Sequence, residues 1–372
     1  MKTIAYLIDT MTCDTAGTQK QLLEIIRRLD RARYSPHLIC LWESPWMRTA
    51  SLPCPVHVLG HAGFLKPSFP GVVRRLGGLV DELGIDLMQT FFDEAIIVGW
   101  LGARAARRRP VLVSSRRDMG LGANNQPWYH RLFPLVLPLV NRDFAAIVAN
   151  SDMVRRYAAR REHTPAAKFV VLPNGVEAPP LQPAPRMWQA DGTVGVGIVA
   201  SLTPVKRHDL LLRAWAILEQ GPVAGQARLF LLGDGPQRGA LEALAAELGI
   251  ADRLAFVGAV DDVAAWLQRL DVGVLCSDRE GLSNAILEYM ACGLPVVATA
   301  VGGNAELVNA GNGLLVVPGD ARALAGALQQ LAADEGLRRR LGAASRERID
   351  DGFTWSRSMG RLTALYDELL SR

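Results

Sequence analysis

Short runs of aliphatic and β-branched residues alternate with amphipathic stretches along the first half of the chain. Residues 4–8 form the first run, and residues 17–29 then place Leu22, Leu23, Ile26 and Leu29 on one helical face. An apolar strand followed by an amphipathic helix is the repeating unit of a parallel sheet. We therefore predict an α/β fold, with further strands at residues 37–41, 56–59, 87–90, 111–114, 146–149 and 169–171.

A proline-rich segment divides the chain into two such series. Residues 177–192 include Pro179, Pro180, Pro183 and Pro185, and this much proline favours an extended connection. The alternation then restarts. We predict strands at residues 194–199, 228–232, 254–257, 272–275 and 295–299, and helices at 209–220, 237–248, 263–270, 283–291, about 321–342 and 355 to the end.

The restart predicts two domains joined by a hinge. The first covers residues 1–176, the hinge 177–192, and the second 193–354. We expect the last helix, residues 355–372, to pack back on the first domain. A ligand site is expected in the cleft between the two domains.

Cysteine usage and hydropathy favour a cytoplasmic protein. The five cysteines are scattered and show no zinc spacing, which indicates reduced thiols in a reducing compartment. The apolar start is too short for a signal peptide. The longest apolar runs, such as residues 133–140 with Pro134 and Pro138, are too short to span a membrane.

Charge is divided unevenly along the chain, although the net charge is only +4. Up to residue 190, Lys and Arg outnumber Asp and Glu, and after it the balance reverses. A basic first half attracts phosphates, anionic lipid or nucleic acid, but it equally fits a solvated arginine-rich surface. No nucleic-acid recognition motif is present, so we expect no nucleic-acid partner.

Residues 278–306 carry the most informative local chemistry. Gly281 loosens the loop after a predicted strand, and Ser283 or Asn284 can cap the next helix, whose N-terminus suits an anion such as phosphate. Glu280 precedes this site and Glu288 lies inside the helix. Two carboxylates beside a phosphate make sense when each accepts hydrogen bonds from ligand hydroxyls, as in sugars and riboses.

The run E-G-L-S-N-A-I-L-E-Y-M-A-C-G-L-P-V-V-A-T, which begins at Glu280, resembles the E-x7-E signature of glycosyltransferase family 4. The similarity continues through V-G-G-N-x-E and G-L-L-V-x-P-G-D. It implies a GT-B fold of two Rossmann-like α/β domains and a retaining transferase. By this resemblance Glu280 binds hydroxyls of the transferred sugar, Glu288 binds the nucleotide ribose, and the amides around Gly281, Leu282 and Ser283 hold the diphosphate.

Other donor-side motifs follow the same family. V-A-S-L-T-P-V-K-R-H-D, residues 199–209, resembles the loop in which an Arg and a Lys neutralise the diphosphate. Lys206 matches the Lys, Ser201 stands where the Arg is usual, and Arg207 is a candidate substitute. L-G-D-G-P and F-V-G also match, which implies that Gly258 lies near the base. In the first half, Gly17 matches a glycine-rich turn beside the phosphates.

The resemblance is strong after residue 194 and loose before 177. S-S-R-R-D-M-G, residues 114–120, fits the family and makes Arg116, Arg117 and Asp118 candidate acceptor-binding residues. Many family members carry a His where this chain reads Q-T-F-F. Phe91 or Phe92 occupies that place, so no general base is assigned there.

Together these features predict transfer of a sugar from a nucleotide-sugar, most commonly a UDP-sugar, to a saccharide or lipid-linked saccharide in bacterial polysaccharide or envelope biosynthesis. We expect Lys206 and Glu280 to be catalytic, and the lack of a D-x-D motif predicts no metal or other cofactor. A nucleotide-sugar 2-epimerase and a non-catalytic sugar-nucleotide-binding partner stay open as alternatives.

A peripheral contact with an anionic membrane is a further expectation. Clusters of arginine in the first half are interleaved with aromatic stretches, and this combination suits a lipid-linked acceptor. The alternative is that the aromatic residues form core and the arginines a solvated face. The residues concerned are Arg104, Arg107, Arg108, Arg109, Arg155, Arg156, Arg160 and Arg161, with Trp128, Tyr129, Phe133 and residues 64–69.

Overall fold

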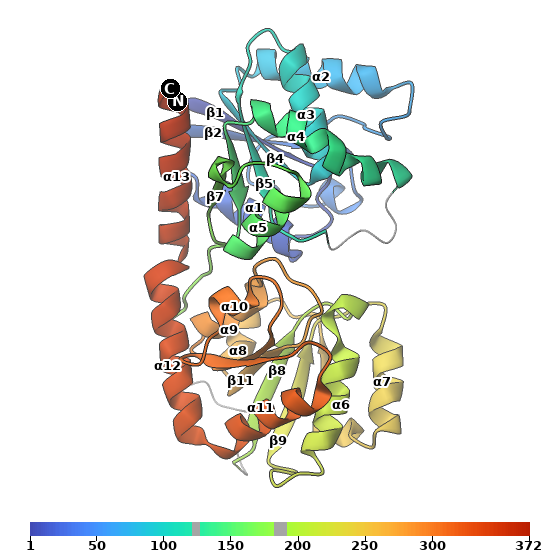
Figure 1. The fold of residues 1–372 in the computed structure, drawn as a ribbon, viewed down its shortest axis with the longest axis vertical. Helices are drawn as coiled ribbons and strands as arrows, with labels where there is room; N and C mark the ends of the chain where they lie inside the picture. Colours follow the sequence, from blue (N-terminus) through green and yellow to red (C-terminus); the bar gives the residue numbers. More distant parts are fainter. Residues whose placement is uncertain (121–126, 182–191) are drawn as a thin grey trace. The chain divides into compact units, whose positions relative to one another are not determined.

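The chain forms two compact units in a computed structural model that describes residues 1–120, 127–181 and 192–372. Unit 1 comprises Met1–Gly175 together with Ser356–Arg372, and unit 2 comprises Val176–Trp355 (Figure 1). Each unit is a parallel sheet covered by helices, as the alternation of apolar runs and amphipathic stretches predicts. Ten residues of the predicted hinge, 182–191, lie outside the described residues.

Unit 1 is built on a seven-stranded parallel sheet in the order β3-β2-β1-β4-β5-β6-β7. Its central strands are mostly buried because helices cover both faces. In β1, for example, every residue from Ile4 to Ile8 is buried. The strands are β1 (Lys2–Ile8), β2 (Tyr34–Cys40), β3 (Val56–Val58), β4 (Leu87–Phe91), β5 (Val111–Arg116), β6 (Ala146–Ala149) and β7 (Phe169–Val171).

Six longer helices flank this sheet, and the last of them returns from the far end of the chain. Tyr366 of this helix is fully buried in unit 1, where its hydroxyl bonds the Gln89 side chain and lies 3.3 Å from the Tyr6 hydroxyl. The helices are α1 (Gly17–Arg28), α2 (Phe69–Glu82), α3 (Asp93–Ala105), α4 (Phe133–Asp143), α5 (Asp152–Arg161) and α13 (Trp355–Ser371).

Unit 2 contains a six-stranded parallel sheet in the order β10-β9-β8-β11-β12-β13. Its strands are β8 (Val194–Val199), β9 (Ala227–Leu232), β10 (Leu254–Gly258), β11 (Val272–Leu275), β12 (Val296–Thr299) and β13 (Gly313–Val316). Its α-helices are α6 (His208–Leu218), α7 (Arg238–Glu247), α8 (Val263–Leu267), α9 (Asn284–Ala291), α10 (Asn304–Leu307), α11 (Ala321–Ala333) and α12 (Glu335–Gly352).

The expected single helix over residues 321–342 is wrong, because the structure divides it at Asp334. Helix α11 ends at Ala333, and the Asp334 carboxylate accepts a hydrogen bond from the Leu337 amide at 2.8 Å. Asp334 is therefore the N-cap of a new helix, α12.

Helix α9 is fixed against the centre of the sheet by one tyrosine. Tyr289 is fully buried, and its hydroxyl accepts a hydrogen bond from the Val199 amide at 2.6 Å and donates one to the Val274 carbonyl at 3.2 Å. Gly273 leaves room for the ring, since a Cβ there would lie 2.4 Å from it. These contacts tie α9 to both β8 and β11, and so position the loops at the ends of these strands.

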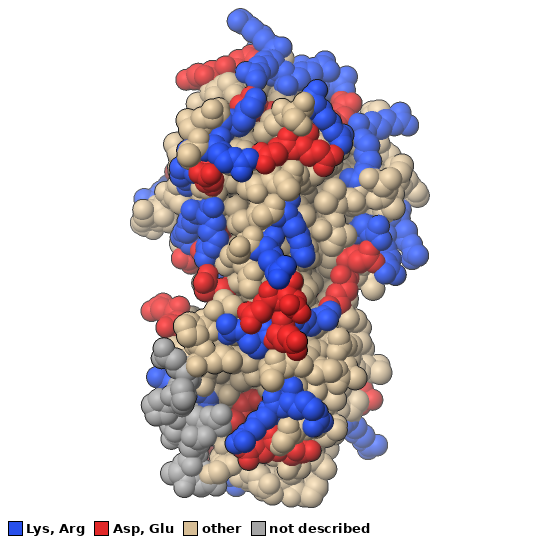
Figure 2. Space-filling model, turned by 90° about the vertical axis from the view of Figure 1, so that its left-hand side faces the viewer, with Lys and Arg blue, Asp and Glu red and all other residues tan. Residues whose placement is uncertain are grey.

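Two surface features bear on the expected partners. Within the described residues, no helix combines the length and the apolar character needed to cross a membrane. On the face shown in Figure 2, groups of Lys and Arg alternate with groups of Asp and Glu, so that face carries charges of both signs.

Candidate active site

The first element of the donor-side site is the loop between β8 and α6, which carries Lys206. Leu202 anchors this loop in the core, and its amide donates to the Asp234 carbonyl at 3.0 Å. Pro204–Lys206 then form one short 3₁₀ turn. The turn brings the Lys206 ammonium nitrogen to 2.5 Å from Oε1 of Glu280, 74 residues away in sequence. The structure thus joins the two residues that the sequence selects as catalytic.

Glu280 is held in place by the loop that follows β11. Its side chain is almost fully buried, and the Ser277 hydroxyl donates to the same Oε1 atom at 2.6 Å. Ser277 is in turn fixed by the Thr299 hydroxyl, which donates to its carbonyl at 2.7 Å. Lys206 and Ser277 therefore hold one oxygen of a carboxylate that burial would otherwise disfavour.

A second loop, between β12 and α10, packs tightly against the Glu280 backbone. The Gly303 amide donates to the Gly281 carbonyl at 2.7 Å. Gly302 has a φ of 50°, and a Cβ there would lie only 1.8 Å from the Glu280 carbonyl oxygen. The glycines of the V-G-G-N motif therefore allow the close approach that fixes Glu280.

Helix α9 begins directly after Glu280, Gly281 and Leu282. Ser283 is its N-cap, as predicted, with its hydroxyl accepting a hydrogen bond from the Ile286 amide at 3.3 Å. The positive end of the helix therefore lies within a few residues of the Lys206–Glu280 pair, an arrangement that suits a negatively charged ligand group. Glu288 is half-buried within α9, and its predicted role at a ribose stays a prediction.

Arg207 points to different partners from Lys206. Its guanidinium lies 3.0 Å and 3.1 Å from the Asp209 carboxylate and 3.0 Å from the Asp278 carboxylate. Hydrogen bonding to Asp209, and secondarily to Asp278, raises the pKa of Arg207 above its ordinary value. Two carboxylates therefore already neutralise this cation, while Ser201 is exposed. The suggested role of Arg207 as a replacement for the usual Arg stays a prediction.

His208 and Cys276, which lie close to Lys206, are uncharged at neutral pH. His208 is fully buried, and burial, followed by the nearby Lys206 charge, lowers its pKa to about 4. Burial also raises the pKa of the Cys276 thiol to about 12, and its sulfur lies 3.2 Å from the Lys206 carbonyl. Neither group titrates near neutral pH, so Lys206 is the cation that this loop presents beside Glu280.

Gly258, predicted to lie near the base, ends β10. It has a φ of 86°, and its carbonyl accepts a hydrogen bond from the Gly233 amide at 2.7 Å. A Cβ at Gly233 would lie 2.1 Å from the Ala200 carbonyl. The loops after β8, β9 and β10 therefore stack through glycine at the same edge of the sheet, and place Gly258 there.

The candidate residues of unit 1 lie at the carboxyl ends of its own strands. Gly17 is the first residue of α1, and the turn before it is ordered by the Gln19 side chain, which accepts from the Thr12 amide at 2.8 Å and the Cys13 amide at 3.1 Å. Burial acts to raise the pKa of the Cys13 thiol, but hydrogen bonds from Thr15 and Ala16 together outweigh it and lower the pKa.

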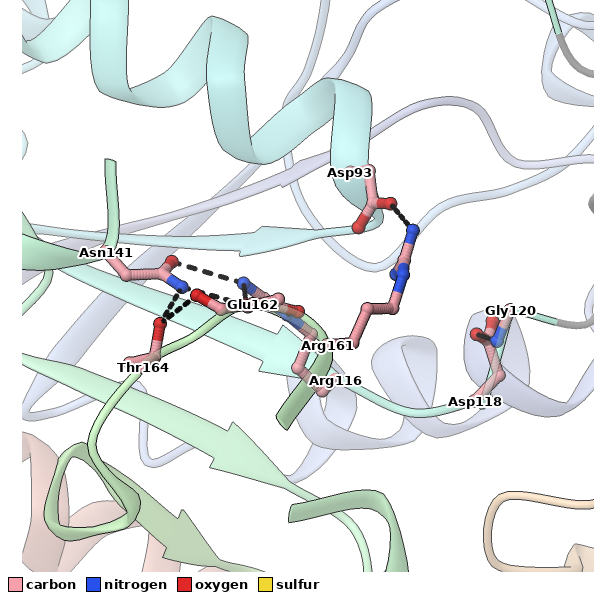
Figure 3. Close-up of polar contacts among 8 residues, drawn as sticks. All are labelled: Asp93, Arg116, Asp118, Gly120, Asn141, Arg161, Glu162 and Thr164. Carbon is pink, nitrogen blue, oxygen red and sulfur yellow. Dashed lines mark hydrogen bonds and ion pairs between the residues drawn. The ribbon is translucent and has the colours of Figure 1, made fainter. Parts of the chain in front are cut away.

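Arg116 is engaged inside unit 1 by a buried network (Figure 3). Its guanidinium lies 2.7 Å and 2.8 Å from the two oxygens of Glu162, which also accepts from Asn141 at 2.8 Å. Burial alone would lower the Arg116 pKa, but Glu162 outweighs it and raises the pKa. Nε and one terminal nitrogen of this buried side chain are engaged within the protein, while Nη1 has no hydrogen-bond partner among the described residues. The contacts with Glu162 favour a structural role over the predicted role at an acceptor.

Arg117 and Asp118 have fewer internal partners. The Arg117 guanidinium lies over the Phe91 ring, 5.6 Å from its centroid, and 2.7 Å from the Asn174 side-chain oxygen. Burial lowers its pKa to about 10. Asp118 accepts from the Gly120 amide at 2.8 Å, and burial raises its carboxyl pKa. Phe91, one of the two candidates for the place where many family members carry a His, is therefore covered by a cation.

Sequence reasoning missed a cluster of titratable groups in which Glu94 and His61 are buried and Asp9 and His130 partly buried. Asp9 follows β1, and its carboxylate accepts from the Ala95 amide at 3.2 Å. Burial, followed by the charge of Glu94, raises the Asp9 pKa to about 8. Glu94 lies 2.7 Å from His130 and 3.4 Å from His61, so two histidines that look unremarkable in sequence flank a buried carboxylate. The one available signal was an aspartate at the end of a buried strand.

Comparison with known proteins agrees with these motifs. A family model described as "Glycosyl transferase 4-like domain" matches residues 16–175, and one described as "Glycosyl transferases group 1" matches residues 193–334. The chain is 30% identical to the lipopolysaccharide core biosynthesis glycosyltransferase LpsD of Rhizobium meliloti (strain 1021), over 82% of this chain and 83% of LpsD. The chain belongs to glycosyltransferase family 4.

Other relatives match over a smaller part of their length. The Vi polysaccharide biosynthesis protein VipC/TviE of Salmonella typhi is 33% identical over 49% of this chain, but only 32% of that protein is covered.

The solved structure of Anabaena HepE in complex with UDP matches with a TM-score of 0.82, at 22% identity, over 99% of this chain and 100% of HepE. This likeness confirms the GT-B fold of two Rossmann-like α/β domains.

Proposed function

We propose that this chain is a retaining glycosyltransferase that transfers a sugar from a UDP-sugar to a saccharide or lipid-linked saccharide in bacterial polysaccharide or envelope biosynthesis. The observation that carries the proposal is the contact between Lys206 and Glu280 beside the Ser283-capped start of α9. A cation, a carboxylate that can accept hydrogen bonds from sugar hydroxyls, and a helix N-terminus together suit a nucleotide diphosphate that carries a sugar.

In the proposed reaction the bond between the anomeric carbon and the diphosphate oxygen breaks as charge develops on the diphosphate. Lys206 and the start of α9 stabilise that charge. The sugar passes through an oxocarbenium-like state, and the acceptor oxygen forms the new bond on the same face. The departing phosphate takes the acceptor proton, so no enzymic nucleophile is required. Glu280 binds hydroxyls of the transferred sugar, and Glu288 binds the ribose.

Names of relatives support the choice of substrates. HepE was solved with UDP, and LpsD acts in lipopolysaccharide core biosynthesis. We propose that unit 2 binds the donor, with Gly258 near the base and the amides of Gly281, Leu282 and Ser283 at the diphosphate. Unit 1 then binds the acceptor through Arg117 and Asp118. The reaction needs no metal, and the protein acts at the cytoplasmic side.

The first experiment is thermal stabilisation of the purified chain by UDP, GDP and ADP and by their sugars, each with added magnesium and with EDTA. We expect a rise in melting temperature with UDP that is the same in both conditions. A rise that requires magnesium would contradict metal independence, and no rise with any nucleotide would contradict the donor site.

A second experiment separates transfer from its alternatives. The chain is incubated with UDP-glucose or UDP-N-acetylglucosamine, alone and with saccharide acceptors, and the product is analysed by proton NMR. An α-linked product from an α-linked donor supports retention. Altered nucleotide-sugar without acceptor would indicate an epimerase, whereas binding without any turnover would indicate a non-catalytic partner.

A further inference from the structure

Helix α4 and the 3₁₀ turn before it (Trp128–Leu132) have an apolar side that the core does not use. Phe133, Leu137 and Val140 point inward and are buried. Large apolar side chains on the other side are exposed, with Leu135 74% and Leu139 55% accessible. We call this set the α4 apolar face, and it consists of Trp128, Leu132, Leu135, Val136 and Leu139.

The spacing of these residues makes one continuous stripe. Leu135, Val136 and Leu139 lie on one face of α4, and Leu132 is the N-cap of this helix. Trp128 begins the 3₁₀ turn that leads into Leu132 and is exposed as well. A surface helix of a water-soluble domain normally carries polar residues opposite its core face. Exposed leucines gathered in one stripe therefore indicate a surface that something else covers.

Charged residues at both ends of the stripe are basic. Arg131 and Arg142 are exposed, and neither side chain has a carboxylate partner among residues 1–120, 127–181 and 192–372. Asp143, the acidic residue of α4, is already engaged by Arg104 at 2.7 Å and by the Trp100 indole nitrogen at 2.7 Å. The α4 apolar face is therefore flanked by cations, which complements an anionic surface.

We propose that the α4 apolar face docks unit 1 onto an anionic lipid membrane, with its leucines and Trp128 in the interfacial layer and Arg131 and Arg142 at the headgroups. An amphipathic tryptophan at the end of an apolar stripe with flanking arginines is the composition of an interfacial helix. The inference goes beyond the proposed function, because it depends on unit 1 alone and not on the donor site.

Charge favours lipid over a second copy of this chain. A two-fold contact between two such stripes in antiparallel orientation would place Arg131 of each copy near Arg142 of the other, and any parallel arrangement would bring each arginine near itself. Either contact sets like charges against each other without a carboxylate between them, which is unfavourable. Anionic headgroups avoid this repulsion.

The structure also changes which residues are expected to reach the membrane. Of the aromatic residues that the sequence suggests, Phe133 is buried, and Phe64 packs on it with ring centroids 5.7 Å apart and on Tyr129 at the same distance. Trp128 is the exposed one, at 64%. Several of the suggested arginines are paired with aspartates, among them Arg155 and Arg156 with Asp152 and Arg161 with Asp93.

The test is flotation of the full chain with vesicles of phosphatidylcholine alone or with about a third phosphatidylglycerol, at about 50 mM and about 500 mM salt. We expect binding to the anionic vesicles that weakens at high salt. The double variant Leu135→Gln/Leu139→Gln should lose at least about tenfold in vesicle affinity, because two apolar side chains no longer enter the lipid. Arg131→Gln/Arg142→Gln should lose the preference for phosphatidylglycerol.

Val317→Gln is the matched control, because Val317 is a similarly exposed apolar residue of unit 2. This variant should bind vesicles as strongly as the unchanged chain. Melting temperature, with and without UDP, checks that each variant folds and keeps its donor site. Absence of binding by the unchanged chain, or full binding by the leucine variant, would overturn the proposal. So would a dimer in sedimentation that the leucine substitutions abolish. A failed nucleotide response with intact vesicle binding would instead count against the proposed function.

Discussion

The ammonium nitrogen of Lys206 lies 2.5 Å from Oε1 of Glu280, and the hydroxyl of Ser277 contacts the same oxygen at 2.6 Å. Lys206 comes from the loop after β8, whereas Glu280 and Ser277 follow β11, the strand next to it in the sheet. Adjacent parallel strands thus deliver a cation and a carboxylate to one place at their carboxyl ends, where ligands bind in open α/β sheets.

Lys206→Ala should lower turnover by about a hundredfold or more, because it removes a fixed positive charge from the site of the departing diphosphate. Initial rates at saturating donor and the melting-temperature response to UDP are the measurements. Arg322→Ala removes one exposed cation of the same unit away from Glu280 and should leave both values unchanged. Turnover of Lys206→Ala close to that of the unchanged chain would show that the diphosphate lies elsewhere.

Glu280→Gln should separate sugar binding from nucleotide binding. The amide keeps the shape of the side chain and a hydrogen-bonding oxygen beside Lys206, but it removes the negative charge. We expect turnover to fall at least about tenfold, with little change in the stabilisation by UDP, since Glu280 is assigned to the transferred sugar. Loss of the UDP response together with turnover would place Glu280 at the nucleotide instead.

Gly302→Ala should displace the Glu280 loop. A Cβ at Gly302 would lie 1.8 Å from the Glu280 carbonyl oxygen, so one of the two loops must move. Gly319→Ala is the control, because Gly319 also has a positive φ, 80°, but meets no atom within 4 Å. Both variants bear the cost of a left-handed alanine, about 1 kcal/mol. Only Gly302→Ala should also lower the rate of sugar transfer from the donor. Equal transfer rates in the two variants would contradict this packing argument.

Every strand that the structure describes except β13 was predicted from the sequence, because buried parallel strands are largely apolar. The predicted residues 194–199, 169–171 and 146–149 coincide with β8, β7 and β6. Helices α2, α3, α4, α5 and α10 were not predicted. Pro134 and Pro138 make the α4 segment look interrupted, yet Pro134 lies in its first turn, where proline is tolerated. In α2, Gly77 and Gly78 weaken the helical pattern, and Gly77 allows close packing, since a Cβ there would lie 3.1 Å from Ala105.

Lys206 and Glu280 were both selected from sequence motifs, but the local contacts around a site residue were predictable only where one segment contains them. Ser283, Glu280 and the V-G-G-N glycines lie within 25 residues of one another in the chain, so their local roles can be read from spacing. The burial of Arg116 could not, because Glu162, 46 residues away, is its partner through the packing of the sheet. The same holds for Asp9, whose surroundings come from the start of α3, 86 residues later.

Arg116→Met should destabilise unit 1 by about 3–5 kcal/mol, because it leaves the Glu162 carboxylate buried without its cation. The double variant Arg116→Met/Glu162→Met should recover much of that loss, since no unpaired charge remains. Urea unfolding monitored by circular dichroism measures both. An unchanged midpoint for Arg116→Met with a raised KM for the acceptor would instead support the role that the sequence suggests for Arg116.

Asp9 should make unit 1 less stable as the pH rises. Its pKa is about 8 in the folded chain, because of burial and the nearby Glu94 charge, and about 3.9 when unfolded. Between these values the folded state holds a proton that the unfolded state releases, so stability is present below about pH 4 and is lost towards pH 8.

Asp9→Asn cannot titrate, and its amide oxygen can still accept from the Ala95 amide. As the pH rises from 5 to 8, the urea midpoint of unfolding of this variant should therefore increase relative to that of the unchanged chain. Asp14→Asn, an exposed substitution of the same charge, controls for net charge. A difference for Asp9→Asn that stays constant across this range would mean that Asp9 is ionised throughout, and that water or a cation reaches its carboxylate.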